Sequence, residues 1–222
     1  MKKRQRILSL WEEETGVRIT QKHSGKMRDL FSLSTSPTCN KGCQARCRVR
    51  GSICEKCFSL RDCGYKGGLK QKLEKNHEIL TTQRLDTTPY LFSPSGYFRI
   101  EAFGDLENVT QAINYLNIIK DNKHLRFAWF TKVPEIIGQA LKESGMEKPK
   151  NVKIIASSLF VNVSDLERFK KLEYVDHVFT VYNAGFIKEN NINITCGARS
   201  CASCGKCYEK KYKEYEIREK LK

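Results

Sequence analysis

Three absences narrow the classes of protein that this sequence of 222 residues can encode. It contains no apolar run of the ~18 residues that a transmembrane helix needs. Neither a Walker A nor a GxGxxG pattern occurs, which argues against the common phosphate-binding loops. The N-terminus, MKKRQRILSLWEEE, is basic, but its apolar part is too short for a secretory signal and is followed directly by acids. We therefore expect a cytoplasmic protein without membrane contacts.

Composition and charge indicate a folded and strongly basic chain. Hydrophobic residues make up 40% of the sequence and aromatic residues 10%, which is enough to form a core and excludes wholesale disorder. The formal net charge is +15, and residues 1–63 hold 14 basic residues against 6 acidic ones. Arg46, Arg48 and Arg50 alternate in this segment. Such a surface attracts phosphate groups of a nucleotide or nucleic acid, but cations also offset the charge of anionic metal centres.

The ten cysteines fall into two groups, separated by a long stretch that contains none. Without export, disulfides are unfavourable, because the cytosol keeps thiols reduced. Both groups lie in segments rich in small and charged residues, which need ligand bonds in place of a hydrophobic core. We therefore expect the cysteines to hold at least one metal centre. The first group is Cys39, Cys43, Cys47, Cys54, Cys57 and Cys63, and the second is Cys196, Cys201, Cys204 and Cys207.

The spacing favours an iron–sulfur cluster and leaves zinc as the alternative. Structural zinc takes pairs of C-x2-C knuckles, which Cys54 and Cys57 could form with a pair from the second group. Closely spaced runs of three or four cysteines are more typical of iron–sulfur clusters. Residues 201–207 have this C-x2-C-x2-C spacing, and Cys196 would complete a four-thiolate site.

The middle of the chain alternates between strand and helix patterns, which predicts an α/β fold. Parallel β/α repeats of this kind form either a partial or full TIM-like barrel or an open, doubly wound sheet. A helix over 69–84 comes before the first of these strands and follows the first cysteine group directly. The predicted strands are 97–103, 125–131, 151–158 and 176–183, with apolar positions at helical spacing between them.

Polar residues at the carboxyl ends of these strands are candidates for binding a cofactor, because function collects at that edge in either fold. Glu101 stands out, since a carboxylate inside an apolar strand needs a partner or a ligand. The polar residues at the ends of the last two strands, Ser158 and Asn183 among them, fit an ordinary strand end equally well. The cofactor-binding candidates are Glu101, Gly104, Asp105, Lys132 and Ser157.

A cysteine-rich loop ahead of a β/α series resembles the layout of the radical S-adenosylmethionine (SAM) superfamily. Cys47-x6-Cys54-x2-Cys57-Phe58 is similar to a C-x6-C-x2-C-aromatic variant in some phage-borne members, whereas the commonest spacing, C-x3-C-x2-C, is absent. The resemblance implies a [4Fe-4S] cluster on Cys47, Cys54 and Cys57, with one iron open to SAM. Glu101–Asp105 would then bind the SAM amino group or ribose, and Lys132 a carboxylate or phosphate.

A second resemblance is to the phage gene-88 protein family, and it extends over most of residues 30–208. It rests on short stretches: Thr38-Cys39, Cys57-Phe58-Ser59, Gly104-Asp105, Thr131-Lys132 and the last three cysteines. Phe58-Ser59 stands where that family has Tyr-Ala, and Cys43, Cys47 and Cys63 are additional. Cys39 could therefore replace Cys47 in the first site. This resemblance implies a protein of a phage or its bacterial host cell.

Together these observations predict a radical-SAM-like iron–sulfur protein with one or two [4Fe-4S] clusters. The second cluster, on Cys196, Cys201, Cys204 and Cys207, would be auxiliary. Such an enzyme needs an electron donor and acts on a substrate that the sequence does not identify, with a nucleotide or nucleic acid as one candidate. The alternative is a non-enzymatic, zinc- or cluster-stapled protein that binds nucleic acid.

We expect a single domain over 1–222 with three parts. A basic segment with the first cysteine group spans 1–63, and a β/α core spans 64–185. Residues 186–222 hold the second cysteine group and a charged tail, for which the run YEKKYKEYEIREKLK predicts a solvated helix.

Overall fold

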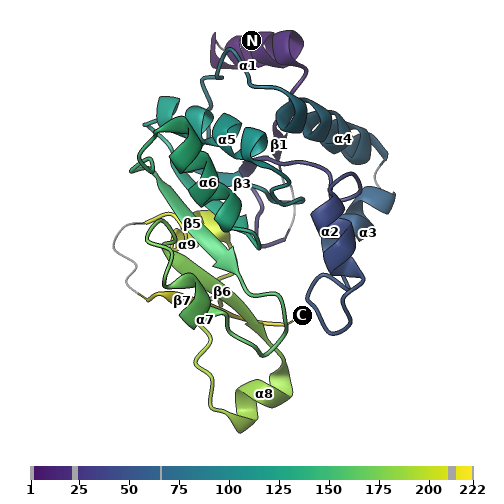
Figure 1. Ribbon diagram of the computed structural model, residues 1–222, viewed down its shortest axis with the longest axis vertical. Helices are drawn as coiled ribbons and strands as arrows, with labels where there is room; N and C mark the ends of the chain where they lie inside the picture. The colour runs from purple at the N-terminus through teal and green to yellow at the C-terminus, as the bar shows by residue number, and fades with distance from the viewer. Residues whose placement is uncertain (1–2, 22–24, 66, 210–213, 222) are drawn as a thin grey trace.

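The computed structural model describes residues 3–21, 25–65, 67–209 and 214–221 (Figure 1). The chain forms an α/β structure around one seven-stranded sheet, in which the strands lie side by side in chain order. The first pair is antiparallel and all the others are parallel. The strands are β1 (Thr20–Gln21), β2 (Phe31–Leu33), β3 (Tyr97–Ile100), β4 (Arg126–Thr131), β5 (Val152–Ser157), β6 (His177–Tyr182) and β7 (Glu216–Lys220).

The sheet is open. Among the described residues β1 pairs with β2 alone and β7 with β6 alone, so the full barrel that the sequence allowed is not formed. The doubly wound alternative is also wrong, because a doubly wound sheet reverses its strand order and this one does not.

One face of the sheet packs against helices and contains the main core. Figure 1 shows α5 (Val109–Asp121) and α6 (Glu135–Ser144) lying across this face, and α4 (Gly67–Thr82) and α7 (Leu166–Phe169) add to the same core. In β4 the fully buried Phe127 and Trp129 point into this core, whereas Ala128 and Phe130 point to the opposite face. We call that opposite face the inner face. The two-residue period of the strand therefore separates two apolar clusters.

The inner face is covered by the C-terminal part of the chain. Ala128, Ile155 and Ile217 from three strands form its buried floor, and Tyr208 packs on them. The cysteines at 196, 201 and 207 are partly buried against this cluster. The second cysteine group therefore lies where a closed barrel would have its interior.

Most predicted elements are confirmed with shifted ends. The strands at 126–131, 152–157 and 177–182, and the helices α4, α5 and α6, lie where the periodicity placed them. The strand predicted over 97–103 stops at Ile100, because Glu101 turns the chain with a positive φ of 55°. The apolar positions around residues 166–172 form only one short helix, α7, which ends at Phe169.

The prediction for the tail is wrong. Residues 216–220 form β7, which pairs in parallel with β6, rather than a solvated helix. Its alternation buries Ile217 between partly exposed charged residues, a pattern that a lysine- and glutamate-rich run conceals. Residues 210–213 and 222 of the predicted helix lie outside the described residues.

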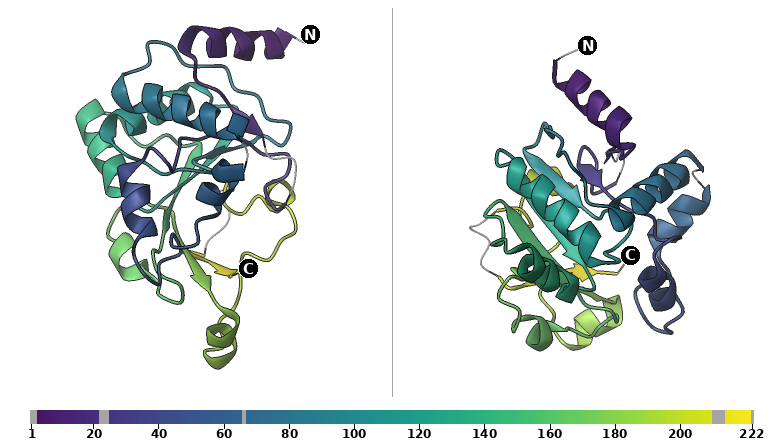
Figure 2. Two further views of the ribbon diagram at one scale, coloured as in Figure 1. Left: turned by 90° about the vertical axis from the view of Figure 1, so that its right-hand side faces the viewer. Right: turned by 45° about the horizontal axis from the view of Figure 1, so that its top comes forward.

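The N-terminal third also belongs to the sheet. Strand β2 supplies the first parallel strand and was not predicted, since three residues are too few to show a period. The first cysteine group, predicted as a loop, contains α2 (Lys41–Cys47) and α3 (Phe58–Tyr65), which lie together beside the sheet (Figures 1 and 2). The remaining helices are α1 (Lys3–Thr15), α8 (Ala184–Glu189) and α9 (Cys201–Cys204). Within the described part of the chain, no helix is both long and apolar enough to cross a membrane.

Candidate metal centres

The second cysteine group is gathered by one short helix and its caps. Helix α9 carries Cys201 and Cys204, and the Ser200 hydroxyl at its start accepts a hydrogen bond from Ser203 N. Gly205 ends the helix with a φ of 64°, where the Tyr97 hydroxyl lies 2.7 Å from the position of an added Cβ. A left-handed, crowded position of this kind requires glycine.

The four thiols of this group lie close enough to influence one another's ionisation. The pKa of Cys207 is raised to about 12, chiefly by burial; the charge of Arg99 opposes the shift, and the charges of the three other thiolates add to it. Burial likewise raises the pKa of Cys196 and Cys201. Neutral thiols are therefore favoured until a bound cation compensates the thiolates.

Two cations from distant parts of the sequence face this group. Lys26 Nζ lies 3.0 Å from Cys196 Sγ and 2.7 Å from Glu219 Oε1. Burial opposes the charge on Lys26, but hydrogen bonds with Cys196 and Glu219 outweigh it and raise its pKa.

Arg99 is the second cation, and it projects from the middle of β3 onto the inner face. Its guanidinium carbon lies 3.3 Å from the centre of the Phe130 ring. Its Nε is buried and has no hydrogen-bond partner among the described residues. Burial lowers the pKa of Arg99, while the ionisable groups that favour its charge are Tyr208, Cys207, Cys201 and Cys196. A cation with a buried, unpaired Nε is stabilised by a nearby anion, and these thiols are among the ionisable groups that act on it.

In the first cysteine group, only some of the thiols lie near one another. Cys47 ends α2, and its thiol shares a hydrogen bond with that of Cys57, with Cys54 close by. Burial and the neighbouring charges of Cys57 and Cys54 raise the pKa of Cys47 to about 11. A backbone hydrogen bond from Ile53 N to Leu159 O anchors the loop between them to the segment after β5. Two thiols of the C-x6-C-x2-C stretch, Cys47 and Cys57, are therefore in contact, and Cys54 is near enough for its charge to act on Cys47.

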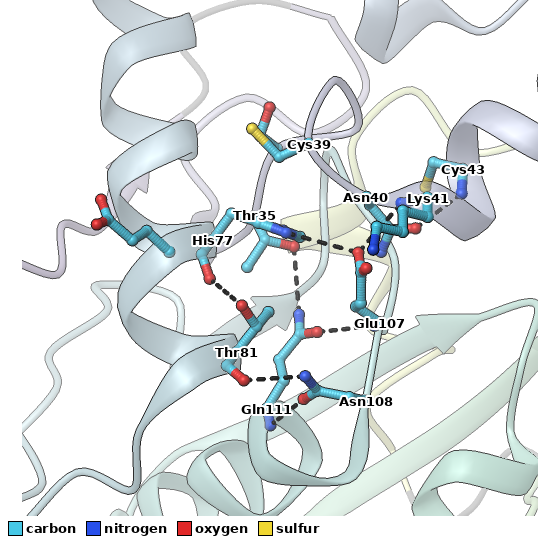
Figure 3. A network of polar contacts seen from close by, with 12 residues as sticks. Thr35, Cys39, Asn40, Lys41, Cys43, His77, Thr81, Glu107, Asn108 and Gln111 are labelled. Carbon is cyan, nitrogen blue, oxygen red and sulfur yellow. Dashed lines mark hydrogen bonds and ion pairs between the residues drawn. The ribbon is translucent and has the colours of Figure 1, made fainter.

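The other cysteines of the first group have different surroundings. Cys39 Sγ lies 4.0 Å from the Thr38 hydroxyl, and Figure 3 shows its side chain directed away from Cys43. Cys63 is buried in a small apolar cluster with Leu73 and Phe103. Cys43 Sγ accepts a hydrogen bond from Arg46 at 3.6 Å, and burial, followed by the charge of Asp105, raises its pKa.

Asp105 joins the cysteine-bearing helix to the strand ends. Its carboxylate accepts hydrogen bonds from Arg46 Nη2 at 3.0 Å, Thr131 Oγ1 at 2.6 Å and Lys132 N at 3.1 Å. The Lys132 ammonium is near enough to lower the pKa of Cys54 against the effect of burial. Arg46 is thus committed to an internal ion pair rather than to an external phosphate.

Glu101 is held entirely by protein donors. Its carboxylate accepts hydrogen bonds from Thr35 N and Oγ1, from Gln111 Nε2 at 2.8 Å and from Tyr115 OH at 2.6 Å. Burial raises its pKa to about 7, although these hydrogen bonds oppose the shift. Glu101 therefore connects the segment after β2 to α5. Gly104 lies beside it, with Thr35 O only 2.6 Å from an added Cβ, and Ser157 ends β5 as a buried residue.

Figure 3 shows a polar network that holds the start of the first cysteine group against α4 and α5. Glu107 Oε2 accepts a hydrogen bond from Lys41 N at 3.2 Å and lies 3.5 Å from His77 Nε2. Gln111 accepts from Glu107 N and donates to the Thr35 hydroxyl. Burial lowers the pKa of His77, so this imidazole is neutral at neutral pH and not a cation for the thiolates.

Several residues of these sites have no local sequence signal. Lys26 and Arg99 precede the second cysteine group by more than ninety residues, and Thr35 and Gln111 look like ordinary polar residues. For Arg99 the sequence offers one indication of a special role. The alternation of β3 places this charged side chain on one face of the sheet, between apolar residues that point to the other face.

No three Cys, His, Asp or Glu side chains within residues 3–21, 25–65, 67–209 and 214–221 converge closely enough to surround one metal ion. The comparisons with known proteins add no assignment: no family model, curated protein or solved structure matches this chain.

Proposed function

We propose that this chain is an iron–sulfur protein whose second cysteine group holds a [4Fe-4S] cluster on the inner face of the sheet. One observation carries the proposal: three thiols of a group with four-thiolate spacing act on Arg99, whose buried Nε has no hydrogen-bond partner among the described residues. A cluster with four thiolates is anionic, and Arg99 and Lys26 would offset that charge. Zinc held by the same four thiolates is the alternative.

The donor set suits such a group in charge and in its apolar surroundings. The thiols line the apolar inner face beside Ala128 and Ile155, so a bound cluster would be shielded from water. Lys26 Nζ donates to Cys196 Sγ, and the charge of Arg99 acts on Cys201 and Cys207. These two cations would keep the thiolates ionised in a setting that otherwise raises their pKa.

We further propose that Cys47, Cys54 and Cys57 hold a second cluster, open to SAM, at the carboxyl ends of the strands. The mutual contact of Cys47 and Cys57 and the neighbouring position of Cys54 support this assignment. Such a cluster, once reduced by an electron donor, would supply the electron for the reductive cleavage of SAM. Lys132, whose charge acts on the Cys54 thiol, would meet a carboxylate or phosphate, while Asp105 orients α2 through Arg46.

The order of the strands supports a partial β/α barrel as the frame for this chemistry. β2 to β7 follow one another in parallel without a reversal, and the core shared by α4, α5, α6 and α7 lies on one face. The inner face is then left for the second cysteine group.

Metal analysis of protein purified without oxygen tests the proposal. We expect brown protein that absorbs near about 400 nm and contains about four iron and four sulfide ions for each cluster. The variant pair Cys201→Ser with Cys204→Ser should lose one cluster, while Cys63→Ala, which alters a core thiol, should keep both. Colourless protein with stoichiometric zinc would overturn the iron–sulfur assignment.

Reductive cleavage of SAM tests the enzymatic part separately. Protein with its clusters and excess dithionite should produce 5′-deoxyadenosine, and Cys54→Ser should abolish this product while it leaves the second cluster intact. Iron-loaded protein that neither binds nor cleaves SAM would refute the enzyme and leave an electron-transfer or structural cluster.

A further inference from the structure

A basic hollow lies at the amino ends of β4 and β5, at the edge of the sheet opposite to the one that carries α2. Five cations line it: Lys120, Lys123, Arg126, Lys150 and Lys153. They come from the last turn of α5, the connection to β4, the start of β4, the connection to β5 and β5 itself. The hollow measures about 510 Å³, and no carboxylate is found in its lining among the described residues.

Most of this charge is not neutralised by the protein. Arg126 pairs with Glu209, and Lys153 lies 2.9 Å from Asp176 Oδ1. Lys120, Lys123 and Lys150 are exposed, and they make no ion pair within the part of the chain that the structure describes. Keeping three free cations around one concavity costs electrostatic free energy, which an anion in the hollow would relieve.

The spread of the cations indicates a chain of anions rather than a single small one. A compact anion site needs buried donors that converge on one point. Here the free ammonium groups are solvent-exposed and lie on separate segments around the hollow. A phosphodiester backbone presents charges at regular intervals and can enter a concave groove, whereas a lipid surface meets a flat or convex patch.

A stacked pair of aromatic rings includes the residue that follows Lys123 in the chain. The Tyr90 ring stacks on His124 with a centroid distance of 4.5 Å and an angle of 10° between the planes. His124 follows Lys123 directly in the chain, and Tyr90 is 41% exposed. Exposed aromatic rings beside a basic groove are how proteins stack the bases of single strands.

We propose that this basic hollow binds the backbone of single-stranded nucleic acid, with a base stacked on Tyr90. The site differs from the one that the alternating arginines suggest, because Arg46 is used internally. The proposal requires neither a cluster nor SAM, so it stands or falls independently of the function proposed above.

Binding of labelled 20-mer oligonucleotides by the full chain, measured by fluorescence anisotropy across a range of salt concentrations, tests the proposal. The triple variant Lys120→Ala, Lys123→Ala and Lys150→Ala should lose at least tenfold in affinity near 0.1 M salt. Its slope of log affinity against log salt should fall by about 2, which is three contacts at about 0.7 each. The DNA and RNA forms of the 20-mer show which sugar is preferred.

The matched control removes the same charge elsewhere. Lys142, Lys171 and Lys188 are exposed lysines outside the hollow, and their triple alanine variant should keep the affinity within about twofold. If both triple variants lost the same affinity, net charge alone would explain the binding, and the proposed site would be wrong. No oligonucleotide binding, or binding of vesicles with anionic lipid in its place, would also overturn it.

Variants of Tyr90 distinguish the contribution of base stacking from that of charge. Tyr90→Phe keeps the ring and should bind like the wild type, whereas Tyr90→Ala should lose about tenfold with an unchanged salt slope. A Tyr90→Ala variant with full affinity would contradict the stacking part. All these substitutions lie at the surface, so an unchanged urea midpoint confirms that the fold is intact.

Discussion

Glu101 shows how a single side chain can unite segments and set a pH dependence. The carboxylate is 3% exposed, follows the end of β3 in a left-handed conformation and receives hydrogen bonds from two other segments. Such strain in a non-glycine residue persists only where the surroundings over-determine it. The nearby ionisable groups are Asp105, which raises its pKa further, and Tyr115, which donates to it. The sequence made Glu101 a candidate for binding a cofactor. In the structure its carboxylate joins the segment after β2 to α5.

Because the folded pKa of Glu101 is about 7, raised from 4.5, this group favours the folded state when it is protonated. Its contribution to stability is therefore largest at acidic pH and declines as pH rises through about 4.5 to 7. We expect Glu101→Gln to remove this decline, so that wild type loses about 2 kcal/mol relative to the variant between pH 5 and pH 8. Urea unfolding at both values measures the difference. Glu189→Gln, at an exposed position, should show none.

At the scale of the element, α2 is a helix held by polar contacts instead of a core. None of its seven residues is buried, although it carries Cys43 and Cys47. The Asn40 side chain caps it through Cys43 N at 2.7 Å and donates to Asp105 O at 2.9 Å. Arg46 supplies a second tie to the same aspartate. The geometry of the first cysteine group therefore depends on a few hydrogen bonds.

Asn40→Ala should destabilise the protein by about 1–2 kcal/mol, because it removes the cap and leaves the Asp105 carbonyl with only the long hydrogen bond from Thr35 Oγ1 at 3.5 Å. Faster amide exchange should be confined to residues 41–47, as measured by hydrogen-exchange mass spectrometry. The control is Asn183→Ala, which removes the equivalent cap of α8, where Asn183 accepts from Phe186 N. Exchange at α2 that is equally fast in both variants would show that Asn40 does not fix this helix.

At the scale of the whole molecule, the sheet joins both ends of the chain. It runs from residue 20 to residue 220, and its last strand completes the floor of the inner face after the second cysteine group. Two faces of one sheet are thus covered by different means, helices on one side and a cysteine-rich segment on the other (Figure 2). The C-terminus is a structural part of the fold.

Two apolar residues of the tail test this arrangement. Ile217 is 2% exposed on the inner face, and Leu221, four residues later, is 43% exposed. Ile217→Ala should cost about 2–4 kcal/mol of unfolding free energy, whereas Leu221→Ala should cost less than about 0.5 kcal/mol. A helical, solvated tail would give two small effects of similar size in urea unfolding.

The sequence by itself determined the β/α series and the two cysteine groups. Strong hydrophobic periods mark β4, α5, α6 and β5, because burial is imposed on every second or every third to fourth residue. Cysteine spacing likewise identifies the second group as one unit, since four thiols within twelve residues cannot separate far.

Only the tertiary structure decided what surrounds those groups. Lys26 and Arg99 meet the second cysteine group because parallel strands bring distant segments together, and no local pattern encodes such a contact. The open sheet, the strand β7 and the internal role of Glu101 depend in the same way on pairing across long sequence separations. Periodicity reports what each segment buries, whereas the partner that buries it is chosen by the packing of the whole chain.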